Sequence, residues 1–388
     1  MPSEDVPRWD VVVTAGGTGG HVLPALAVVD ELVAAGVARE RIGFVGGQRG
    51  IEGEAVPAAG VAFRGLDVRG LRRGFSPRAL LANLGAIWAL IGAMRRARRI
   101  LRRSGARVVV AMGGYASVPP VLAAARRRQR IVVYESNSVP GIATRLAARR
   151  AAVTTCAMDA TVPLLRRAER IGYMVRRPLD RFASDPAIRT ALAAEAREVY
   201  GIGADQRVVA VVGGSQGARS LNEATLGLVR DWCDRGDIAV VHLAGRRDID
   251  MVTAAAASLP GCDLRYLPIG FEDRMERVLA VCDLMVCRAG ASTCAELAAT
   301  GTAAVCVPYP HATADHQRLN AEALAAAGAA VVVADADVTP ETLAASVGAL
   351  LADDARLSSM RGAAATLGAA NGARELAARV CALLEDAA

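Results

Sequence analysis

The chain has 388 residues, of which 53% are hydrophobic and only 4% aromatic, and it carries a net charge of +7. This length exceeds that of a usual single domain, so we expect two domains whose cores consist mostly of Ala, Val and Leu. The eight Cys form neither CxxC pairs nor a regular framework, and no signal peptide precedes them, which argues against a disulfide-rich secreted protein and indicates reduced thiols in a cytoplasmic one.

The charge is unevenly distributed along the chain. Residues 1–175 hold 26 Arg against 12 acidic residues, a balance of +14, whereas residues 176–388 hold 20 Arg against 27 acidic residues, a balance of −7. The basic half indicates a partner rich in phosphate, an anionic lipid surface or a nucleic acid. The alternative is a charge bias that serves solubility alone.

Short β-branched runs alternate with Ala-rich helical segments from one end of the chain to the other. This alternation predicts an α/β fold with parallel sheets that helices cover on both faces. The predicted strands are DVVVTA, IGFVGG, ARVVVAMGG and IVVYES in the first half and RVVAVVGG, IAVVHLAG, DLMVCRAG and AAVCVP in the second.

The first predicted strand ends in GGTGG (residues 16–20), and His21, one of only four His in the chain, follows at once. Glycine permits positive φ and close approach of the backbone, and the first N–H groups of a helix point at an anion, so the pattern is typical of a phosphate site. The spacing fits neither GxGxxG nor a P-loop, which argues against a nicotinamide enzyme. The alternative is a tight turn that binds nothing.

An uncharged run covers residues 79–94 and contains Trp88. Its 16 residues are too few for a membrane span of about 20. Arg95 and Arg99 belong to a cluster of Arg that follows, and further Arg precede the run. Such a helix can lie in the membrane interface, and the alternative is an ordinary sheet-covering helix with a solvated Arg end.

Two more segments place polar groups at the ends of strands. GGYASVPP (residues 113–120) contains Tyr115, and Glu135 ends IVVYE. Because ligands of open α/β sheets bind outside the carboxyl ends of the strands, these groups and GGTGG should share one edge of the sheet.

The second half repeats the plan of the first. GGSQG (residues 213–217) follows a strand and opens a helix, as GGTGG does. A polar stretch with two Pro near residues 175–185 marks the boundary, which gives domains 1–175 and 176–364. The C-terminal helix, about residues 365–388, could pack back on the first domain.

Six motifs occur in one order: GGTGGHVLPALAV, GGYASVPP, ESNSVPG, GGSQGARSLN, CRAGASTCAELAATG and ADHQRLNA. In this set the chain closely resembles the MurG family, which transfers N-acetylglucosamine from UDP to the lipid-linked N-acetylmuramyl-pentapeptide of peptidoglycan synthesis. The resemblance covers almost the whole chain. It implies a GT-B fold, in which two Rossmann-like domains face each other across a cleft, the first for the acceptor and the membrane and the second mainly for the sugar nucleotide.

The resemblance also implies site residues at the positions that match these motifs. The loop residues Thr18, Gly19 and Gly20 would face the sugar and the diphosphate. Glu296 would bind the ribose hydroxyls and Gln317 the sugar. The remaining donor contacts it implies are Asn137, Arg176, Ser215, Phe271, Glu272, Met275, Ala291, Ser292 and Thr293, of which Phe271, Glu272 and Met275 would surround the uracil.

The chain departs from the family pattern at two places. It reads Glu135-Ser136-Asn137 where the family commonly reads EQN, and Tyr173-Met174-Val175-Arg176 where the family commonly reads NPVR. Asn137 and Arg176 are retained, so the contacts they imply are retained too. The resemblance does not predict the backbone conformation around Tyr173.

The implied reaction needs a base for the acceptor hydroxyl and stabilisation of the departing UDP. We predict His21 as the base, because imidazole titrates near the working pH and the glycine loop puts it at a strand end. The alternative is that His21 braces the loop. Glu135 is a second candidate base, and Tyr115 is expected to position the acceptor.

No metal or other cofactor is expected, because helix N-termini and Arg can stabilise the diphosphate. We interpret two DxD tripeptides, residues 248–250 and 335–337, as solvated acids rather than metal ligands.

The predicted function is therefore inverting transfer of N-acetylglucosamine to the C4 hydroxyl of the lipid-linked acceptor, at the cytoplasmic face of the cell membrane, with no nucleic acid as partner. Three alternatives remain open at this point. They are another GT-B enzyme, such as an antibiotic-type glycosyltransferase or a UDP-N-acetylglucosamine 2-epimerase, a nucleic-acid-binding protein, and a sugar-nucleotide-binding protein without catalysis.

Overall fold

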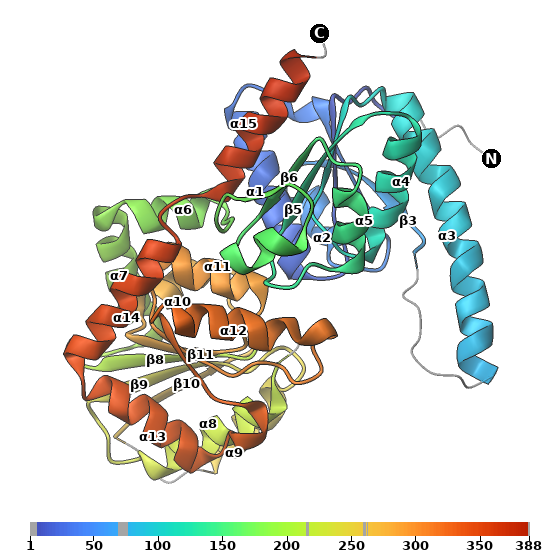
Figure 1. Cartoon of the computed structure of the whole chain (residues 1–388). Helices are drawn as coiled ribbons and strands as arrows, with labels where there is room; N and C mark the ends of the chain where they lie inside the picture. Colours follow the sequence, from blue (N-terminus) through green and yellow to red (C-terminus); the bar gives the residue numbers. More distant parts are fainter. Residues whose placement is uncertain (1–5, 69–76, 215–216, 259–260, 262, 387–388) are drawn as a thin grey trace. The chain divides into compact units, whose positions relative to one another are not determined.

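The computed structural model describes residues 6–68, 77–214, 217–258, 261 and 263–386, and the backbone alone of residues 77–84 and 87. The chain forms two compact units, Met1–Arg176 with Asn371–Ala388, and Arg177–Ala370 (Figure 1). The division falls after Arg176, one residue later than the sequence suggested. The segment that returns to the first unit begins at Asn371.

The first unit contains a seven-stranded parallel sheet in the order β3-β2-β1-β4-β5-β6-β7. Its central strands are runs of fully buried, mostly β-branched residues, as expected for a sheet covered on both faces. The strands are β1 (Val11–Thr14), β2 (Ile42–Gly47), β3 (Ala62–Leu66), β4 (Val108–Ala111), β5 (Arg130–Glu135), β6 (Val153–Cys156) and β7 (Ala168–Arg170).

Helices form two layers on this sheet (Figure 1). One layer contains α1, which packs on α2 and α15, and the other contains α3, α4 and α5. The helices are α1 (Gly19–Ala34), α2 (Glu52–Ala58), α3 (Pro77–Ser104), α4 (Val118–Arg126), α5 (Ile142–Ala148) and α15 (Gly372–Glu385), with short 3₁₀ turns η1 (Arg39–Arg41), η2 (Tyr115–Ser117) and η3 (Asp159–Leu164).

The second unit contains a six-stranded parallel sheet in the order β10-β9-β8-β11-β12-β13. Its strands are β8 (Arg207–Val212), β9 (Ile238–Leu243), β10 (Arg265–Ile269), β11 (Leu284–Cys287), β12 (Ala304–Cys306) and β13 (Ala330–Val332). Its helices are α6 (Arg177–Ser184), α7 (Pro186–Tyr200), α8 (Arg219–Asp231), α9 (Ile249–Ala257), α10 (Met275–Val281), α11 (Ala291–Thr300), α12 (His316–Ala326), α13 (Pro340–Leu351) and α14 (Asp354–Leu367), with 3₁₀ turns η4 (Thr313–Asp315) and η5 (Asp335–Asp337).

The α/β prediction is confirmed, and all eight predicted strands are present as β1, β2, β4, β5, β8, β9, β11 and β12. The sequence missed five others. Four of them, β3, β7, β10 and β13, are the edge strands of the two sheets. An edge strand is covered less completely than a central one, so β3, β7 and β10 carry polar residues, Gly or Pro and lack a continuous apolar run. The apolar strand β13 does not fit this explanation.

The C-terminal helix α15 belongs to the first unit. Leu376 and Val380 are fully buried, and the helix packs on α1. The start of α15 is hydrogen-bonded to the last residues before the chain passes into the second unit. Gly372 N donates to Tyr173 O over 2.8 Å, and Asn371 Nδ2 donates to Val175 O over 3.3 Å. Tyr173, at the departure from the family pattern, is itself buried.

The expectation of uniformly reduced thiols is wrong at one position. Cys233 is disulfide-bonded, whereas six other Cys are free, and five of those are buried. No regular Cys spacing marks this bond, so it could not be predicted from the sequence.

Candidate active site

The glycine loops lie where each sheet reverses its strand order. In the first unit β1 pairs with β2 on one side and with β4 on the other, and in the second unit β8 pairs with β9 and β11 in the same way. The connections on the two sides of such a strand run in opposite directions, which leaves room for a ligand at the carboxyl ends. The loops after β1, β4, β8 and β11 are therefore the candidate site of each unit.

The loops after β1 and β4 approach each other at backbone distance. A Cβ on Gly114 would lie 2.0 Å from Gly16 O, so no residue with a side chain fits there, and Gly114 has φ of +80°. Gly17 has φ of +98° and leads into Thr18, which precedes the first turn of α1. The GGTGG segment is therefore shaped by its contact with the GGY segment.

His21 lies in the first turn of α1, beside both loops. Its Nδ1 is 3.3 Å from Thr18 Oγ1. A Cβ on Gly113 would lie 2.8 Å from Cδ2 and 3.1 Å from Nε2 of His21, so the imidazole packs against the GGY segment. The half-buried ring is thus held between the two loops, with Gly19 and Gly20 directly before it in α1.

Tyr115 follows Gly114 and covers the first loop. A Cβ on Gly17 would lie 3.1 Å from Cε1 of Tyr115, and the ring is 43% exposed. The phenol is therefore placed next to His21's loop and remains open to solvent, as a group that positions a substrate requires.

Glu135 ends β5 and is buried, but both its oxygens are occupied. Oε1 accepts from Asn137 N over 3.1 Å and from Asn137 Nδ2 over 3.0 Å, and Oε2 accepts from Gly141 N over 3.2 Å. The carboxylate therefore holds the 136–141 loop closed and orients the Asn137 amide. These bonds make it a poorer candidate base than His21.

Arg176 is paired within the first unit. Its guanidinium donates to Asp30 of α1 from Nε over 3.2 Å and from Nη2 over 3.0 Å. The pair is partly exposed, with 39% of the Arg176 side chain accessible. A donor contact by Arg176 would have to add to this pair or replace it.

Sequence reasoning missed Glu52, the first residue of α2. Its fully buried carboxylate accepts from Gly47 N over 2.8 Å and from Gly17 N over 3.4 Å. The only signal was an acid within the glycine-rich stretch GGQRGIEG that follows β2.

The loop after β8 rests on a buried polar network. His242 donates or accepts at both ring nitrogens, with Tyr266 Oη at 2.7 Å and Asn222 Oδ1 at 3.0 Å, and Asn222 Nδ2 reaches Asp248 over 3.2 Å. Burial lowers the pKa of His242 to about 4, so it is neutral at physiological pH. Ser215, a predicted donor contact in this loop, lies outside the described residues.

The interpretation of the two DxD tripeptides as solvated acids is wrong for their first members. Asp248 is 13% exposed and takes part in the network under Gly217. Asp335 accepts from Arg288 over 2.6 Å and from Ser220 over 2.6 Å in a largely buried cluster. Burial with hydrogen-bonding partners, which the tripeptide pattern does not reveal, makes both acids structural.

Helix α11 begins with an open N-terminus. Gly290 precedes it and supplies no capping side chain, and among the described residues no side chain accepts from the N–H groups of Ala291, Ser292 and Thr293. A Cβ on Gly290 would meet no atom of these residues within 4 Å. The buried Ser292 hydroxyl finds no hydrogen-bond partner in the described part of the chain. Such an N-terminus is suited to a diphosphate.

Glu296 lies one turn further along α11 and is only partly exposed. Burial raises the pKa of its carboxyl to about 7, and within the described ranges no donor bonds to it. A carboxylate without internal donors is suited to accept from two hydroxyls of a ligand, as the predicted ribose contact requires.

The predicted uracil contacts gather between β10 and α10. Phe271 is 44% exposed, and the Arg246 guanidinium lies 4.1 Å from its ring centroid. Glu272 accepts from Tyr200 Oη over 2.8 Å and from Arg274 N over 2.8 Å, which fixes the turn before Met275. The aromatic ring is thus accessible and the turn that presents it is rigid.

Gln317, in the first turn of α12, accepts from Tyr309 N over 3.0 Å. The turn before this helix is strained, because Ala314 and Asp315 both have positive φ, at 53° and 55°. The buried Asn320 donates to Ala289 O over 3.2 Å and so ties α12 to the segment that leads into α11. Asn320 was not predicted, although it stands in the ADHQRLNA motif.

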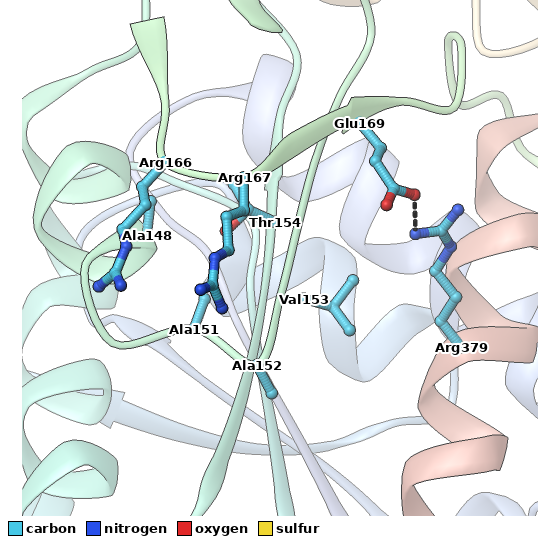
Figure 2. Close-up of a pocket in the computed structure, with 9 residues that line it drawn as sticks. All are labelled: Ala148, Ala151, Ala152, Val153, Thr154, Arg166, Arg167, Glu169 and Arg379. Carbon is cyan, nitrogen blue, oxygen red and sulfur yellow. Dashed lines mark hydrogen bonds and ion pairs between the residues drawn. The ribbon is translucent and has the colours of Figure 1, made fainter. Parts of the chain in front are cut away.

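One hollow of about 250 Å³ lies elsewhere in the first unit (Figure 2). Its walls come from the segments that precede β6 and β7, hence from the amino ends of the strands, opposite the glycine loops. Arg166 and Arg167 line one side, and Glu169 and Arg379 form an ion pair on the other. No predicted site residue lies there.

The exposed face of α3 carries the predicted membrane residues. Trp88 is 71% exposed, and Arg95 and Arg99 are exposed on the same face at helical spacing, while Ala93, Ala97 and Ile100 are buried on the opposite one. Among the described residues, every helix is too short or too polar to span a membrane. Nor do three or more His, Cys, Asp or Glu of these residues gather as a metal site.

Comparison with known proteins identifies both halves of the chain. Residues 11–155 match the glycosyltransferase family 28 N-terminal domain, and residues 208–380 match its C-terminal domain. The chain is 39% identical over 379 residues to the UDP-N-acetylglucosamine–N-acetylmuramyl-(pentapeptide) pyrophosphoryl-undecaprenol N-acetylglucosamine transferase of Acidothermus cellulolyticus, covering 97% of this chain and 98% of that protein.

Solved structures give a consistent picture. The MurG of Acinetobacter baumannii superposes with a TM-score of 0.71 at 26% identity, covering 98% of this chain and all of that one. A calicheamicin glycosyltransferase (TM-score 0.67, 18% identity, 98% and 100% covered) and the UDP-GlcNAc 2-epimerase of Neisseria meningitidis (0.63, 10%, 96% and 99%) share the fold alone.

The raised pKa of Glu296 makes the stability of the free protein depend on pH. Between pH 4.5 and 7 the folded state keeps a proton that the unfolded state has lost, so the free energy of unfolding falls as the pH rises through this window. Glu296→Gln removes the effect and should stabilise the protein at pH 8, relative to pH 5, by about 1–3 kcal/mol, allowing for partial solvent screening.

Denaturant unfolding at the two pH values measures this difference. Glu198→Gln, at an exposed position of α7, is the matched control and should show no such dependence. A Glu296→Gln gain that is equal at both pH values would contradict the assignment.

Proposed function

This chain belongs to glycosyltransferase family 28, and we infer that it transfers N-acetylglucosamine from UDP-N-acetylglucosamine to N-acetylmuramyl-(pentapeptide) pyrophosphoryl-undecaprenol. The observation that carries this inference is a relative of that name that matches both units over nearly their whole length. The antibiotic-type transferase and the epimerase share only the fold with this chain, so they are weaker candidates.

The donor is proposed to bind the second unit. The open N-terminus of α11 suits the diphosphate, with the unpartnered Ser292 hydroxyl as an additional donor. Glu296 accepts from the ribose hydroxyls, and Phe271 offers an apolar face for the uracil. The negative charge that develops on the departing UDP is stabilised by the helix N-terminus.

The acceptor is proposed to bind the first unit, with His21 as the base. The C4 hydroxyl oxygen attacks the anomeric carbon on the side opposite to UDP, its proton passes to His21, and the bond to the diphosphate oxygen breaks with its electron pair leaving on UDP. For Nε2 to take the proton, Nδ1 must carry a hydrogen, and Thr18 Oγ1 at 3.3 Å is placed to accept it. Tyr115 lies beside this loop to position the sugar.

The membrane is proposed to be bound by the exposed face of α3, defined by Trp88, Arg95 and Arg99. An exposed indole and Arg on one face combine apolar insertion with attraction to anionic headgroups. The lipid-linked acceptor makes such a contact necessary. We place the protein at the cytoplasmic face as a peripheral protein, and the basic half serves lipid rather than nucleic acid.

The transfer reaction makes a direct prediction about UDP release. UDP should be released from UDP-N-acetylglucosamine only when the lipid-linked muramyl-pentapeptide acceptor is present, with one UDP per disaccharide formed. A coupled UDP assay and mass spectrometry of the lipid product measure both. Release of UDP without acceptor, or formation of free N-acetylmannosamine, would favour a hydrolase or an epimerase instead.

The base assignment predicts that His21→Ala lowers kcat by about 10²–10⁴-fold with nearly unchanged UDP affinity, because the base acts on the acceptor. His21→Asn keeps a hydrogen-bonding side chain beside Thr18 but cannot take a proton. The two variants should therefore be similarly impaired, as measured by saturating-substrate rates across pH. An Asn variant with most of the wild-type rate would reassign His21 to bracing the loop and leave the base to Glu135 or a water.

The membrane assignment predicts that the protein sediments with vesicles that contain anionic lipid, less with neutral ones, and less at high salt. Trp88→Ala with Arg95→Glu and Arg99→Glu should weaken binding by about tenfold or more, since each Arg contributes about 1 kcal/mol. Arg230→Glu with Arg356→Glu, at exposed positions of the second unit, makes the same charge change and should have little effect. Equal losses in both variants would mean that net charge alone drives binding.

A further inference from the structure

Glu52 is buried where the loops of the first unit meet. Its carboxylate is fully buried at the carboxyl edge of the sheet, with Oε1 2.8 Å from Gly47 N and both oxygens 3.4 Å from Gly17 N. It therefore bridges the last residue of β2 and the loop after β1, which are remote in sequence.

The surrounding loops are shaped to this carboxylate. A Cβ would lie 2.6 Å from Oε1 if placed on Gly16, 2.8 Å from Oε1 on Gly47 and 2.0 Å from Oε2 on Gly50. All three distances are shorter than real Cβ contacts, so a side chain at any of these positions would displace the Glu52 carboxylate from the place it occupies. The glycines of the first unit thus admit a carboxylate of the protein itself.

No basic side chain neutralises this charge. Across the residues that the structure describes, the carboxylate forms no ion pair, and its hydrogen-bond donors are backbone N–H groups. A buried charge is costly unless donors surround it, and glycine-rich loops supply such donors to bound anions. A phosphate bound to a glycine-rich loop would accept from backbone N–H groups in the same way as this carboxylate does.

We propose that Glu52 fills the anion position of the first glycine loop and is a positioning residue for the transfer reaction. The diphosphate of either substrate is then kept out of the position at Gly17 N and Gly47 N, and the two glycine loops, alike in sequence, have different tasks. The loop after β1 is held by an internal anion to orient groups, whereas the open helix N-terminus after β11 binds an external one.

The connection from Glu52 to His21 is short. Gly17, which donates to Glu52, is followed by Thr18, whose Oγ1 lies 3.3 Å from His21 Nδ1. Gly16 is in backbone contact with Gly114, and the His21 ring packs on the adjacent Gly113. Loss of the carboxylate should therefore release both loops that hold the imidazole. This part of the proposal rests on the proposed function.

The kinetic test uses three variants and one matched control. Glu52→Ala and Glu52→Gln should lower kcat by tenfold or more, with the KM for UDP-N-acetylglucosamine and the calorimetric UDP affinity within twofold of wild type. Glu52→Gln keeps the shape of the side chain but points an NH₂ group at the backbone N–H donors, which cannot accept from it. Glu52→Asp keeps the carboxylate and should recover part of the rate. Glu54→Ala, at an exposed position of the same helix, should leave kcat unchanged.

Chemical rescue separates an anion from mere packing. Formate should restore activity to Glu52→Ala by entering the vacated position, whereas neutral formamide should not, and neither should affect Glu52→Gln, whose position is filled. If Glu52→Ala does not fold, Glu52→Gln alone decides, and full kcat in a folded Glu52→Gln overturns the proposal. Rescue by formamide as strong as by formate also overturns it.

A measurement without turnover distinguishes this proposal from the proposed function. Amide hydrogen exchange at Gly17 and Gly47 should accelerate in Glu52→Ala and slow again with formate. Inorganic phosphate should not shift these amide signals in the wild type, and a shift would show that the position is open to anions. If wild-type transfer activity is absent but exchange behaves as expected, the proposed function fails and the internal anion stands.

Discussion

The close approach of two backbone loops at the strand crossover governs the first unit. Gly16 and Gly114 meet at a distance that admits no side chain, and this contact exists only because β1 and β4 are neighbours in a parallel sheet. Everything proposed for catalysis follows from it. His21 is clamped between the loops, Tyr115 is laid over Gly17, and the Glu52 carboxylate fits beneath because its neighbours carry no Cβ. The proposed base is thus placed by backbone geometry rather than by a large polar network.

The second unit solves a related problem in another way. Its loop after β8 rests on His242, Asn222 and Asp248, a network that is neutral at its centre because burial keeps the imidazole unprotonated. Two groups proposed to bind the donor, the Ser292 hydroxyl and the Glu296 carboxylate, have no hydrogen-bond partner among the described residues. An unsatisfied buried group lowers the stability of the free protein and favours the binding of a ligand that satisfies it. Functional sites commonly contain such groups.

Sequence patterns predicted the central strands and the glycine loops because both depend on local residue types. The edge strands β3, β7 and β10 escaped because half-covered strands need no continuous apolar run. Asp248 and Asp335 looked like surface acids, and only tertiary packing shows their partners. Glu52 was missed for the same reason, since one of its donors, Gly17 N, lies 35 residues away in sequence. The exposure of Trp88 likewise depends on which face of α3 the sheet covers, and the apolar run alone does not reveal it.

The helix α15 has a consequence for how the protein is made. A ribosome delivers residues 371–388 after the whole of the second unit, yet these residues complete the first. Until then α1 lacks the cover of Leu376 and Val380, and the carbonyls of Tyr173 and Val175 lack their later donors. The unit synthesised first is therefore the unit that matures last, so it depends longest on protection by chaperones. A tag or deletion at the C-terminus acts on the first unit rather than on the unit that precedes it in the chain.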